Sequence, residues 1–494
     1  MINTPEIQER IENTQRSLFR LWSPVTLDEM WTYIAILMLM GVIKKPEYHL
    51  YWSTRHLLST PIFPRLMRRD RFEEIRKMIH FTKPDDEVED DSLRKLRVTM
   101  EYLVGKFRAN YVPQEALAID EYLSLWKGRL SFRVYIPNKR ERYGVKLYML
   151  CESSSGYLWN FIIYTGATTS YTEPAEQSAN NPFIFEDLKS PLKVVLSLLS
   201  DLLGKGYSVT LDNYYTSPEI AEILLNYNTD CYGTLRAKAN LPYDFWYWRP
   251  VRGNPPEKKF NGDLMVLRWN DVTKTKKEKV VSMLSTIHTG QLIDSGKRNF
   301  RTGEAVYKPD VIVDYNSTMG GVDLLSRVVI PYSSQRRGVK WYRKLGELFI
   351  DIAMYNSYLV YKKVIFDDAI DTHLKFKINV IEELMTRHHH GAAAPNRGPN
   401  AGPNLLRLVE RHFLAFLPAT DKKLNAQKRC HRCTKRKIRK DTRYHCPDCN
   451  VPLCFEPCFK IYHTKRDYTK DYEDNEETQS SSQDTEVSSN NSFD

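Results

Sequence analysis

The stretch YSVTLDNYYTSPEIAEIL, residues 207–224, places an acid where an apolar strand is expected to end. Val209 and Leu211 alternate as in a strand, and Asp212 follows them directly. Ser217 and the proline after it are a helix-start signal, so the stretch predicts a strand, a turn and a helix. An aspartate at such a junction is usually a turn or cap residue, and an Asx-turn at Asp212 is one interpretation. The other interpretation requires further acids nearby.

The elements around this stretch predict an α/β sheet. The runs EALAIDEYLSLW, LSFRVYIP, VKLYMLCES and YLWNFIIYTG, between residues 115 and 166, are rich in β-branched and aromatic residues and predict sequential strands. A helix is expected from Ser190 to a stop at Gly204, followed by the strand at 207–212, the helix at 217–226 and a strand in CYGTLRA. Three strands, helix, strand, helix, strand is the element order of an RNase H-like fold with mixed strand direction.

The remaining segments differ from this core in composition. Residues 1–112 carry apolar residues at helical spacing and predict an all-helical N-terminal domain. The predicted parts that follow are a catalytic core at 113–237 and 305–331, a β-rich insertion at 238–304 with a basic hairpin, a Pro/Gly-rich linker at 386–418, a Cys-rich module at 419–468 and a disordered acidic tail at 469–494.

The bulk composition favours a folded intracellular protein with a polyanionic partner. Hydrophobic residues make up 42% of the 494 residues, which excludes wholesale disorder, and the net charge of +11 favours nucleic acid as a partner. The apolar run from Tyr33 to Ile43 is about half as long as a membrane helix and predicts a buried helix. Six of the eight cysteines lie between Cys430 and Cys458, which favours a local metal site over a disulfide scaffold.

Three aspartates occupy comparable places in the predicted elements. Asp120 ends the apolar run ALAI, Asp212 ends VTL, and Asp323 follows Gly-Gly-Val at the start of a helical run. In an RNase H-like sheet the first and fourth strands are neighbours, so the ends that carry Asp120 and Asp212 are expected to lie close together. Asp310 and Asp314, in KPDVIVDYN, compete with Asp323 for the third position.

Three carboxylates in one place repel one another, and divalent cations relieve that repulsion. Two Mg²⁺ ions about 4 Å apart can activate a water or a 3′-hydroxyl and stabilise the leaving oxygen in phosphoryl transfer. Mn²⁺ usually substitutes for Mg²⁺ at oxygen-rich sites. The three aspartates are therefore the predicted catalytic and magnesium-binding residues.

Several long blocks resemble the piggyBac transposases and their domesticated relatives. They are AIDEYLSLWKGRL, YIPNKRERYGVKLYMLCESSSGYLWN, VTLDNYYTS, DVIVDYNSTMGGVDLL and KWYRKL, and the resemblance runs from about residue 20 to about residue 466. It implies that Asp120, Asp212 and Asp323 are the catalytic aspartates of a metal-dependent, dimeric, nuclear DNA transposase. It also implies hairpin intermediates, seamless excision, insertion at TTAA, and helices at 332–385 that fold back on residues 1–112 to complete a dimerisation and DNA-binding domain.

The sequence departs from the family in two places. Family members commonly carry another aspartate three residues after the third catalytic one, and Ser326 stands at that position here. Residues i and i+3 share a helix face, so the missing acid is expected to weaken metal binding or to mark a domesticated copy. The predicted folded region begins almost at residue 1 without the family's acidic leader, as expected of a truncated or decayed copy.

Seven cysteine and histidine residues within 34 positions have the spacing of structural zinc ligands. They are Cys430, Cys433, Cys446, Cys449, Cys454, Cys458 and His463. Seven ligands exceed one tetrahedral site, so two Zn²⁺ ions in an interleaved cross-brace are expected. His445 is taken as the eighth ligand, with His431 as the alternative. Residues His388–His390 are interpreted as linker composition rather than as ligands.

Basic groups near these sites predict contacts with DNA. The predicted DNA-binding residues are Lys139, Arg142, Arg336, Arg337, Lys340, Trp341, Lys435, Arg436 and Lys437. Lys146, Arg343 and Lys344 belong to the same basic groups. Trp341 is equally compatible with stacking on an exposed base and with core packing, and the segment TKRKIRK at 434–440 is also compatible with a solvated loop or a nuclear localisation signal.

Three hypotheses follow from these patterns. The first is a nuclear, Mg²⁺-dependent DNA transposase that acts as a homodimer on transposon ends and TTAA targets. The second is a catalytically impaired, domesticated DNA-binding protein in which the zinc module binds DNA. The third is a zinc-module protein that recognises another protein or chromatin. The presence of all three aspartates favours the first, and Ser326 favours the second.

Overall fold

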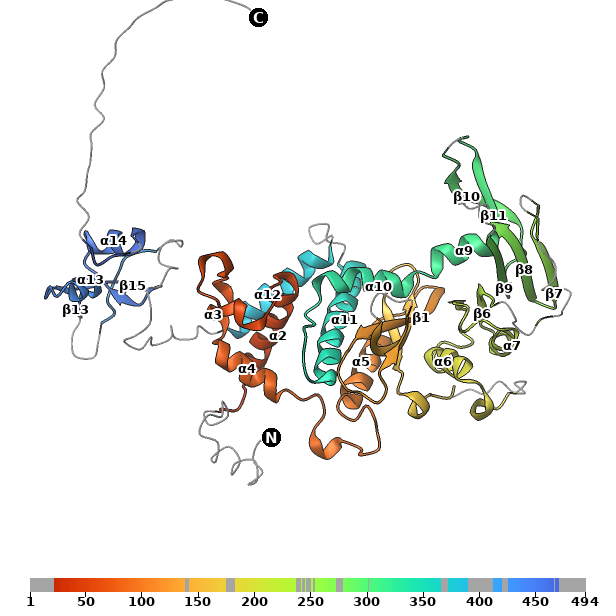
Figure 1. Ribbon diagram of the computed structural model, residues 1–494, viewed down its shortest axis with the longest axis horizontal. Helices are drawn as coiled ribbons and strands as arrows, with labels where there is room; N and C mark the ends of the chain where they lie inside the picture. The colour runs from red at the N-terminus through yellow and green to blue at the C-terminus, as the bar shows by residue number, and fades with distance from the viewer. Residues whose placement is uncertain are drawn as a thin grey trace, which may run out of the picture. The chain divides into compact units, whose positions relative to one another are not determined.

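A computed structural model of the chain defines its architecture (Figure 1). The described residues are 22–137, 142–174, 183–236, 241, 245, 250–251, 254–271, 279–300, 302–365, 372–389, 412–419, 425–465 and 467–470. The chain divides into two compact units, one formed by residues 1–46 with 66–390 and the other by residues 47–65 with 391–494.

The larger unit is built on a nine-stranded sheet with the order β2-β3-β1-β5-β6-β9-β8-β7, in which β4 also pairs with β3. β1 (Ala116–Leu125) pairs antiparallel with β3 (Tyr143–Glu152), and β3 pairs antiparallel with β4 (Leu158–Ile163). On its other side β1 pairs in parallel with β5 (Ser208–Leu211), which pairs in parallel with β6 (Asp230–Thr234). This order is consistent with the RNase H-like core expected from the sequence.

One predicted strand is much shorter than expected. The run LSFRVYIP contributes only β2 (Val134–Tyr135), which pairs with the start of β3. Consequently the three sequential core strands are β1, β3 and β4, and the run YLWNFIIYTG forms the third of them rather than an extension of a hairpin.

The helices on either side of β5 agree with their sequence signals. α6 (Ser190–Leu199) has proline in its first turn, and α7 (Pro218–Asn226) begins after Ser217. The Ser217 side chain accepts a hydrogen bond from the backbone N–H of Ile220, as an N-cap residue does. Gly204, before β5, adopts a φ of 71°, which glycine tolerates better than other residues. The strand, turn and helix predicted for residues 207–226 are therefore confirmed.

Most of the predicted insertion extends the core sheet. β8 (Leu264–Asp271) and β9 (Lys279–Ser285) form the predicted hairpin, whose basic tip lies outside the described residues. β9 pairs antiparallel with β6, and β7 (Glu257–Asn261) pairs with β8. β10 (Leu292–Arg298) and β11 (Ala305–Pro309) form a separate two-stranded ribbon (Figure 1).

Two short helices follow this ribbon in the chain. α9 (Asp310–Thr318) and α10 (Gly321–Val329) both contact strands of the core, and α10 contacts β1 and β3. The sequence predicted α10 as a helical run. α9 contains the run KPDVIVDYN from its aspartate onward, for which no element was predicted.

The larger unit also contains the helices α2 (Leu27–Val42), α4 (Arg69–Met78), α5 (Arg97–Asn110), α11 (Trp341–Val364) and α12 (His373–His388). Most of the short helix α3 (Ile62–Leu66) belongs to the smaller unit. Thr26 and Glu29 form a capping box at the start of α2, which confirms the helix start predicted there. None of the helices that the structure describes combines the length and the apolar composition needed to cross a bilayer.

α11 and α12 pack against helices from the start of the chain. Ile381 of α12 is buried together with Ala35 and Met38 of α2, and Phe349 of α11 contacts Phe161 of β4 with 5.1 Å between the ring centroids. The C-terminal helices therefore fold back on the N-terminal helices and on the sheet, as the resemblance implied.

A buried ion pair joins these two helices. Lys377 Nζ of α12 lies 3.0 Å from Asp351 Oδ1 of α11, and both side chains are almost fully buried. The second carboxylate oxygen of Asp351 accepts hydrogen bonds from the Ser334 backbone and hydroxyl, and Lys377 also donates to the Tyr332 carbonyl. The pair is therefore satisfied by further hydrogen bonds, as a buried ion pair must be.

The smaller unit holds the Cys-rich module. β12 (Ala415–Phe416), β15 (Tyr444–Cys446) and β16 (Val451–Pro452) form one small sheet, and β13 (Lys428–Arg429) and β14 (Asp441–Thr442) form another. The short helices α13 (His431–Lys435) and α14 (Cys458–Thr464) complete it. Because α12 extends to His388 and β12 pairs with β15, the predicted linker 386–418 was too long at both ends. From residue 471 onward the predicted acidic tail lies outside the described residues.

Candidate active site and metal-binding module

Asp120 and Asp212 stand at the same end of the parallel strand pair. In the register of β1 and β5, Ile119 lies opposite Leu211. The residue that follows each of them along the chain is an aspartate, Asp120 after Ile119 and Asp212 after Leu211. β5 ends at this point, while β1 continues to Leu125 in its pairing with β3. Neighbouring strands lie about 4.8 Å apart, so the expectation that these two strand ends are neighbours is confirmed.

The two aspartates also belong to the same face of the sheet. Side chains alternate along a strand, so Asp120 shares a face with Ala118, and Asp212 continues the face of Thr210. Thr210 Oγ1 lies 2.8 Å from the hydroxyl of Thr318 in α9. A Cβ atom added to Gly321 of α10 would lie 3.4 Å from Ala118 Cβ and 3.0 Å from a carbonyl oxygen of β3. α9 and α10 therefore cover the face to which both aspartates belong.

Asp323 belongs to α10, two residues after the close contact at Gly321. Its side chain is exposed and lines an open surface depression together with Ser326 and Arg327. Among the residues that the structure describes, the sets of three or more acids, histidines or cysteines with ligand atoms within 4.8 Å of one another both lie in the C-terminal module. Neither of these sets contains Asp120, Asp212 or Asp323, so the three carboxylates do not converge to that distance.

The main chain of Asp212 closes the turn that follows β5. Its carbonyl oxygen accepts hydrogen bonds from the backbone N–H groups of Tyr215, at 2.9 Å, and Thr216, at 3.1 Å. Gly233 of β6 lies directly beside this turn, where an added Cβ would come within 2.2 Å of the Leu211 carbonyl oxygen. The turn is therefore held by backbone groups and by close packing, and an Asx-turn through the Asp212 carboxylate is not what closes it.

The two competing aspartates have hydrogen-bond partners elsewhere. Asp310 Oδ1 accepts from the backbone N–H of Gly290 at 3.0 Å, and Asp314 Oδ2 lies 3.0 Å from His288 Nε2. His288 Nδ1 in turn lies 2.7 Å from the buried Ser285 hydroxyl. These contacts join α9 to the loop after β9, which favours a structural role for Asp310 and Asp314.

Tyr315 of α9 is a neighbour of the two strand-end aspartates that the sequence did not single out. Burial raises the pKa of its hydroxyl, and the charges of Asp212 and Asp120 raise it further, against a hydrogen bond with Thr234 that lowers it. The sequence did not predict that α9 covers the face of the sheet to which the aspartates belong, so it could not identify Tyr315 as their neighbour.

Several cations that were predicted to contact DNA have protein partners. Arg336 donates to the carbonyl of Met40 in the last turn of α2, and Lys340 Nζ donates to the carbonyl of Lys77 in the last turn of α4, at 3.1 Å. Cations at helix C-termini satisfy carbonyls that lack an intrahelical partner. Trp341 packs edge-on against Phe132, with 5.2 Å between ring centroids.

Other predicted DNA contacts remain accessible. The side chains of Arg142, Arg337, Lys435 and Lys437 are exposed, and that of Arg436 is half-buried. Lys139 lies outside the described residues.

The C-terminal module brings two sets of four metal-ligating side chains together. One set consists of Cys430, Cys433, Cys454 and Cys458, and the other of His412, Cys446, Cys449 and His463. Along the chain the two CxxC pairs contribute to different sets, so the sets are interleaved as a cross-brace requires.

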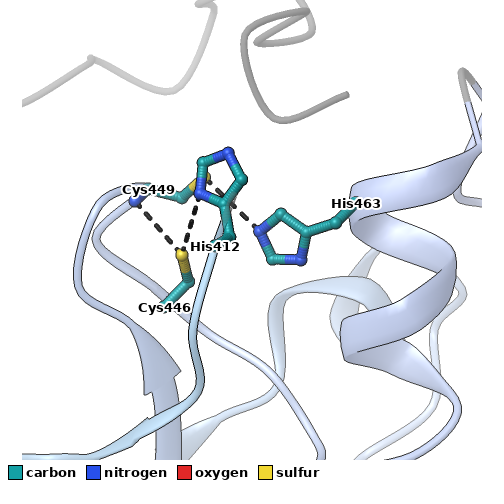
Figure 2. A group of neighbouring side chains, drawn as sticks. All are labelled: His412, Cys446, Cys449 and His463. Atoms are coloured by element: carbon teal, nitrogen blue, oxygen red, sulfur yellow. Dashed lines mark hydrogen bonds between the residues drawn. The ribbon is translucent and has the colours of Figure 1, made fainter. Parts of the chain in front are cut away.

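The distances within each set fit tetrahedral zinc. Cys433 Sγ lies 3.6 Å from Cys458 Sγ, and His412 Nδ1 lies 3.4 Å from Cys446 Sγ and 3.5 Å from Cys449 Sγ. Ligand bonds of about 2.0–2.3 Å give tetrahedron edges of about 3.3–3.8 Å. Figure 2 shows the mixed set, in which the four side chains point toward a common centre, with the His463 ring extending from α14. The residues present therefore fit two Zn²⁺ ions.

The eighth ligand is His412, and the prediction of His445 was wrong. Successive residues of a strand point to opposite sides, so in β15 His445 faces away from the site that its neighbour Cys446 reaches. The alternative, His431, directs Nε2 to the Tyr468 hydroxyl at 3.1 Å. His412 enters the site because β12 pairs with β15, and this long-range contact leaves no local spacing signal.

The all-cysteine set is crowded and partly charge-compensated. A hydrogen bond from Cys458 lowers the pKa of the Cys430 thiol to about 4, whereas burial raises the pKa of Cys454 to about 12. The buried Arg432, which the sequence did not single out, lies 3.9 Å from Cys458 Sγ through Nη1 and donates to the carbonyl of Tyr468 through Nε. A cation beside thiolates offsets part of their negative charge.

Comparisons with known proteins agree with these features. A family model described as Transposase IS4 matches residues 5–358, and one described as a DDE_Tnp_1-like zinc finger matches residues 411–464. The human "PiggyBac transposable element-derived protein 3" is 24% identical over 450 residues, which cover 89% of this chain and 71% of that protein. The human "PiggyBac transposable element-derived protein 2" is 24% identical over 364 residues, covering 70% of this chain but 57% of that protein.

A solved structure shares the fold. The cryo-EM structure of a piggyBac transposase synaptic complex with hairpin DNA matches with a TM-score of 0.64 and 24% identity, and the match covers 90% of this chain and 92% of that chain. The family model spans well over half of the sequence. The chain therefore belongs to the piggyBac-type transposase family, with a zinc finger module at its C-terminal end.

Proposed function

We propose that this chain is a DNA transposase that performs metal-dependent cut-and-paste phosphoryl transfer, with hairpin-forming excision and integration at TTAA. The observation that carries the proposal is the placement of Asp120 and Asp212 where the parallel pairing of β1 with β5 ends, on the face covered by the helix that bears Asp323. A transposase of this family needs an acidic centre at which DNA phosphates meet metal ions, and this region is the acidic centre that the geometry supports best.

The donor set suits Mg²⁺. Asp120, Asp212 and Asp323 would hold the ions, because Mg²⁺ prefers a few carboxylates together with phosphate oxygens and water. When bound, two such ions polarise the phosphate and activate the attacking hydroxyl or water. The protein fixes Asp120 and Asp212 through strand register in an RNase H-like core, and α10 presents Asp323 from the covering layer.

The C-terminal module would support DNA binding. Two structural Zn²⁺ ions would fix the fold of the module, and the exposed Lys435 and Lys437 lie between ligand pairs, where they would contact phosphates. The proposed protein acts in the nucleus as a homodimer on transposon ends. The match to a synaptic complex supports the choice of DNA as the partner.

Strand cleavage tests the proposal. The substrate is duplex DNA with the element's own ends flanked by TTAA, and the proteins compared are the wild type, Asp212→Asn and Asp314→Asn. Asp212→Asn should lose cleavage by about 10³-fold or more, since a metal ligand is removed, whereas Asp314→Asn should retain it. Equal cleavage by the wild type and Asp212→Asn would refute the assignment of Asp212.

A second candidate function has its own observation. Ser326 lies one helical turn after Asp323 and lines the same depression, where family members commonly place an acid. This favours a domesticated, catalytically impaired protein that binds specific DNA sequences. Tight binding to transposon ends without cleavage by the wild type, in either Mg²⁺ or Mn²⁺, would select this function over the first.

A further inference from the structure

Lys146 of β3 carries its ammonium group into a cluster of tyrosine rings. Its Nζ lies 4.5 Å from the ring centroid of Tyr148, 4.8 Å from that of Tyr164 and 5.5 Å from that of Tyr214. The fourth neighbour is Glu121 of β1, whose Oε2 is 3.8 Å away. The lysine side chain is only 14% exposed, so these cation–π contacts act on a largely desolvated cation.

This cluster lies on the opposite face of the sheet from the aspartates. The register of β1 and β3 pairs Glu121 with Tyr148 and Asp120 with Met149. Directly opposed residues of an antiparallel pair point to the same side, and successive residues point to opposite sides. Lys146, two residues before Tyr148, therefore shares the face of Glu121 and cannot reach the face of Asp120.

The cluster is nevertheless attached to the turn that carries Asp212. Tyr214 is the second residue after Asp212, and the next residue, Tyr215, is buried against Tyr148 with 6.3 Å between ring centroids. From the end of β6 a second cation contacts the same turn, because the Arg236 guanidinium lies 5.0 Å from the Tyr214 ring. Its Nε also donates to the side-chain oxygen of Asn213 at 3.3 Å.

We propose that Lys146 is a positioning residue for Asp212. By holding the Tyr214 ring from behind the sheet, it fixes the turn after β5 so that the Asp212 carboxylate stays beside Asp120. Lys146 also contacts Glu121, the residue after Asp120, so one cation anchors both strand ends. This inference rests on the proposed metal site, since it concerns how that site is held.

The geometry favours positioning over a contact with DNA. Basic composition alone grouped Lys146 with cations that flank the hairpin and meet phosphate. An ammonium enclosed by three rings and a carboxylate would have to leave all four neighbours to reach a phosphate oxygen. Arg142, four residues earlier, is exposed and suits phosphate contact better.

The test measures metal binding directly. Mn²⁺ binding to the full chain without DNA is followed by electron paramagnetic resonance for the wild type, Asp212→Asn, Lys146→Met, Tyr214→Phe and Tyr214→Leu. Lys146→Met and Tyr214→Leu should each raise the apparent Kd for Mn²⁺ about tenfold, since each removes a desolvated cation–π contact. Tyr214→Phe keeps the ring face and should stay within about twofold of the wild type.

A matched control separates this effect from the loss of any lysine. Lys106 of α5 lies 5.3 Å from the ring of Tyr102 on an exposed helix surface, and Lys106→Met should leave Mn²⁺ affinity unchanged. Thermal melting of every variant shows whether the fold is retained, and the comparison of Tyr214→Phe with Tyr214→Leu tests the contact independently if Lys146→Met does not fold.

The possible failures are distinguishable. If Asp212→Asn loses Mn²⁺ binding while Lys146→Met and Tyr214→Leu keep wild-type affinity, the positioning role is wrong and the proposed metal site stands. If Lys146→Met keeps wild-type Mn²⁺ affinity but binds transposon-end DNA more weakly in a parallel titration, Lys146 is a phosphate contact and the inference is overturned. If Asp212→Asn binds Mn²⁺ as the wild type does, both the metal site and the inference fail.

Discussion

The two candidate metal-binding regions of this protein differ in how far their ligands have come together. In the C-terminal module the ligand atoms of each set lie within 4.8 Å of one another, whereas Asp120, Asp212 and Asp323 do not converge to that distance. Most thiols and imidazoles of such a set can stay neutral and share a small volume, whereas ionised carboxylates repel one another when no cation lies between them. The difference suggests that the fold alone shapes the zinc module, whereas the proposed acidic site would be completed by its ions and substrate.

The zinc module gives the largest expected effect. His412→Ala should lower the zinc content of the purified chain from two ions to one, because a tetrahedral site loses a ligand that the fold supplies through β12. His445→Ala is the matched control and should keep both ions, since His445 faces away from the site. Zinc is measured by plasma emission spectrometry. The reverse pattern, with loss only in His445→Ala, would restore His445 as the ligand.

Adding a carboxylate on α10, one turn after Asp323, should strengthen metal binding at the proposed acidic site. Ser326→Asp places a carboxylate one turn after Asp323 and should lower the Mg²⁺ concentration for half-maximal cleavage by about threefold to tenfold, as one further ligand contact would. Arg327→Asp puts the same charge on the neighbouring position of α10 and controls for a general acidic effect. If both variants respond alike, the gain is not specific to the metal site.

Glu347 of α11 is a buried carboxylate, and burial makes its charged form unfavourable. We expect a smaller effect from this residue than from the metal sites. Burial raises the pKa of Glu347 to about 7, and the side chain accepts a long hydrogen bond, at 3.4 Å, from the backbone N–H of Arg336. A raised carboxyl pKa gives stability that is present below the unfolded value and is lost as the pH rises through about 7.

Glu347→Gln should therefore match the wild type in stability near pH 5 and exceed it near pH 8 by about 1 to 3 kcal/mol. Urea unfolding of both proteins at the two pH values measures this difference. A glutamine variant that is less stable at pH 8 would show that the charged form of Glu347 is stabilised by its cationic neighbours Arg343 and Arg76.

The sequence predicted most of the zinc module because its ligands are local. Seven ligands follow from CxxC and CxxxC spacing and from His463, and the structure brings all seven together. His412 was missed because it lies 18 residues before Cys430 and reaches the site through the pairing of β12 with β15. Long-range strand pairing of two-residue strands leaves no periodicity to detect.

At the sheet edge, the sequence predicted which strands are neighbours but not the details that decide function. The parallel pairing of β1 with β5 follows from element order, whereas the exact register and the enclosure of Lys146 required the structure. Charge alone also did not show that Arg336 and Lys340 donate to carbonyls at helix ends, because a cation that binds such a carbonyl and a cation that binds phosphate look alike in the sequence. Their contacts with DNA stay predictions.

The central claim is that Asp120, Asp212 and Asp323 form one metal site when ions and DNA are present. Anomalous X-ray scattering from crystals of the chain with Mn²⁺ and transposon-end DNA tests it most directly. We predict manganese density between the Asp120 and Asp212 carboxylates, with Asp323 as a further ligand, and loss of that density in Asp212→Asn. Manganese bound elsewhere on the chain, or unchanged density in Asp212→Asn, would contradict it.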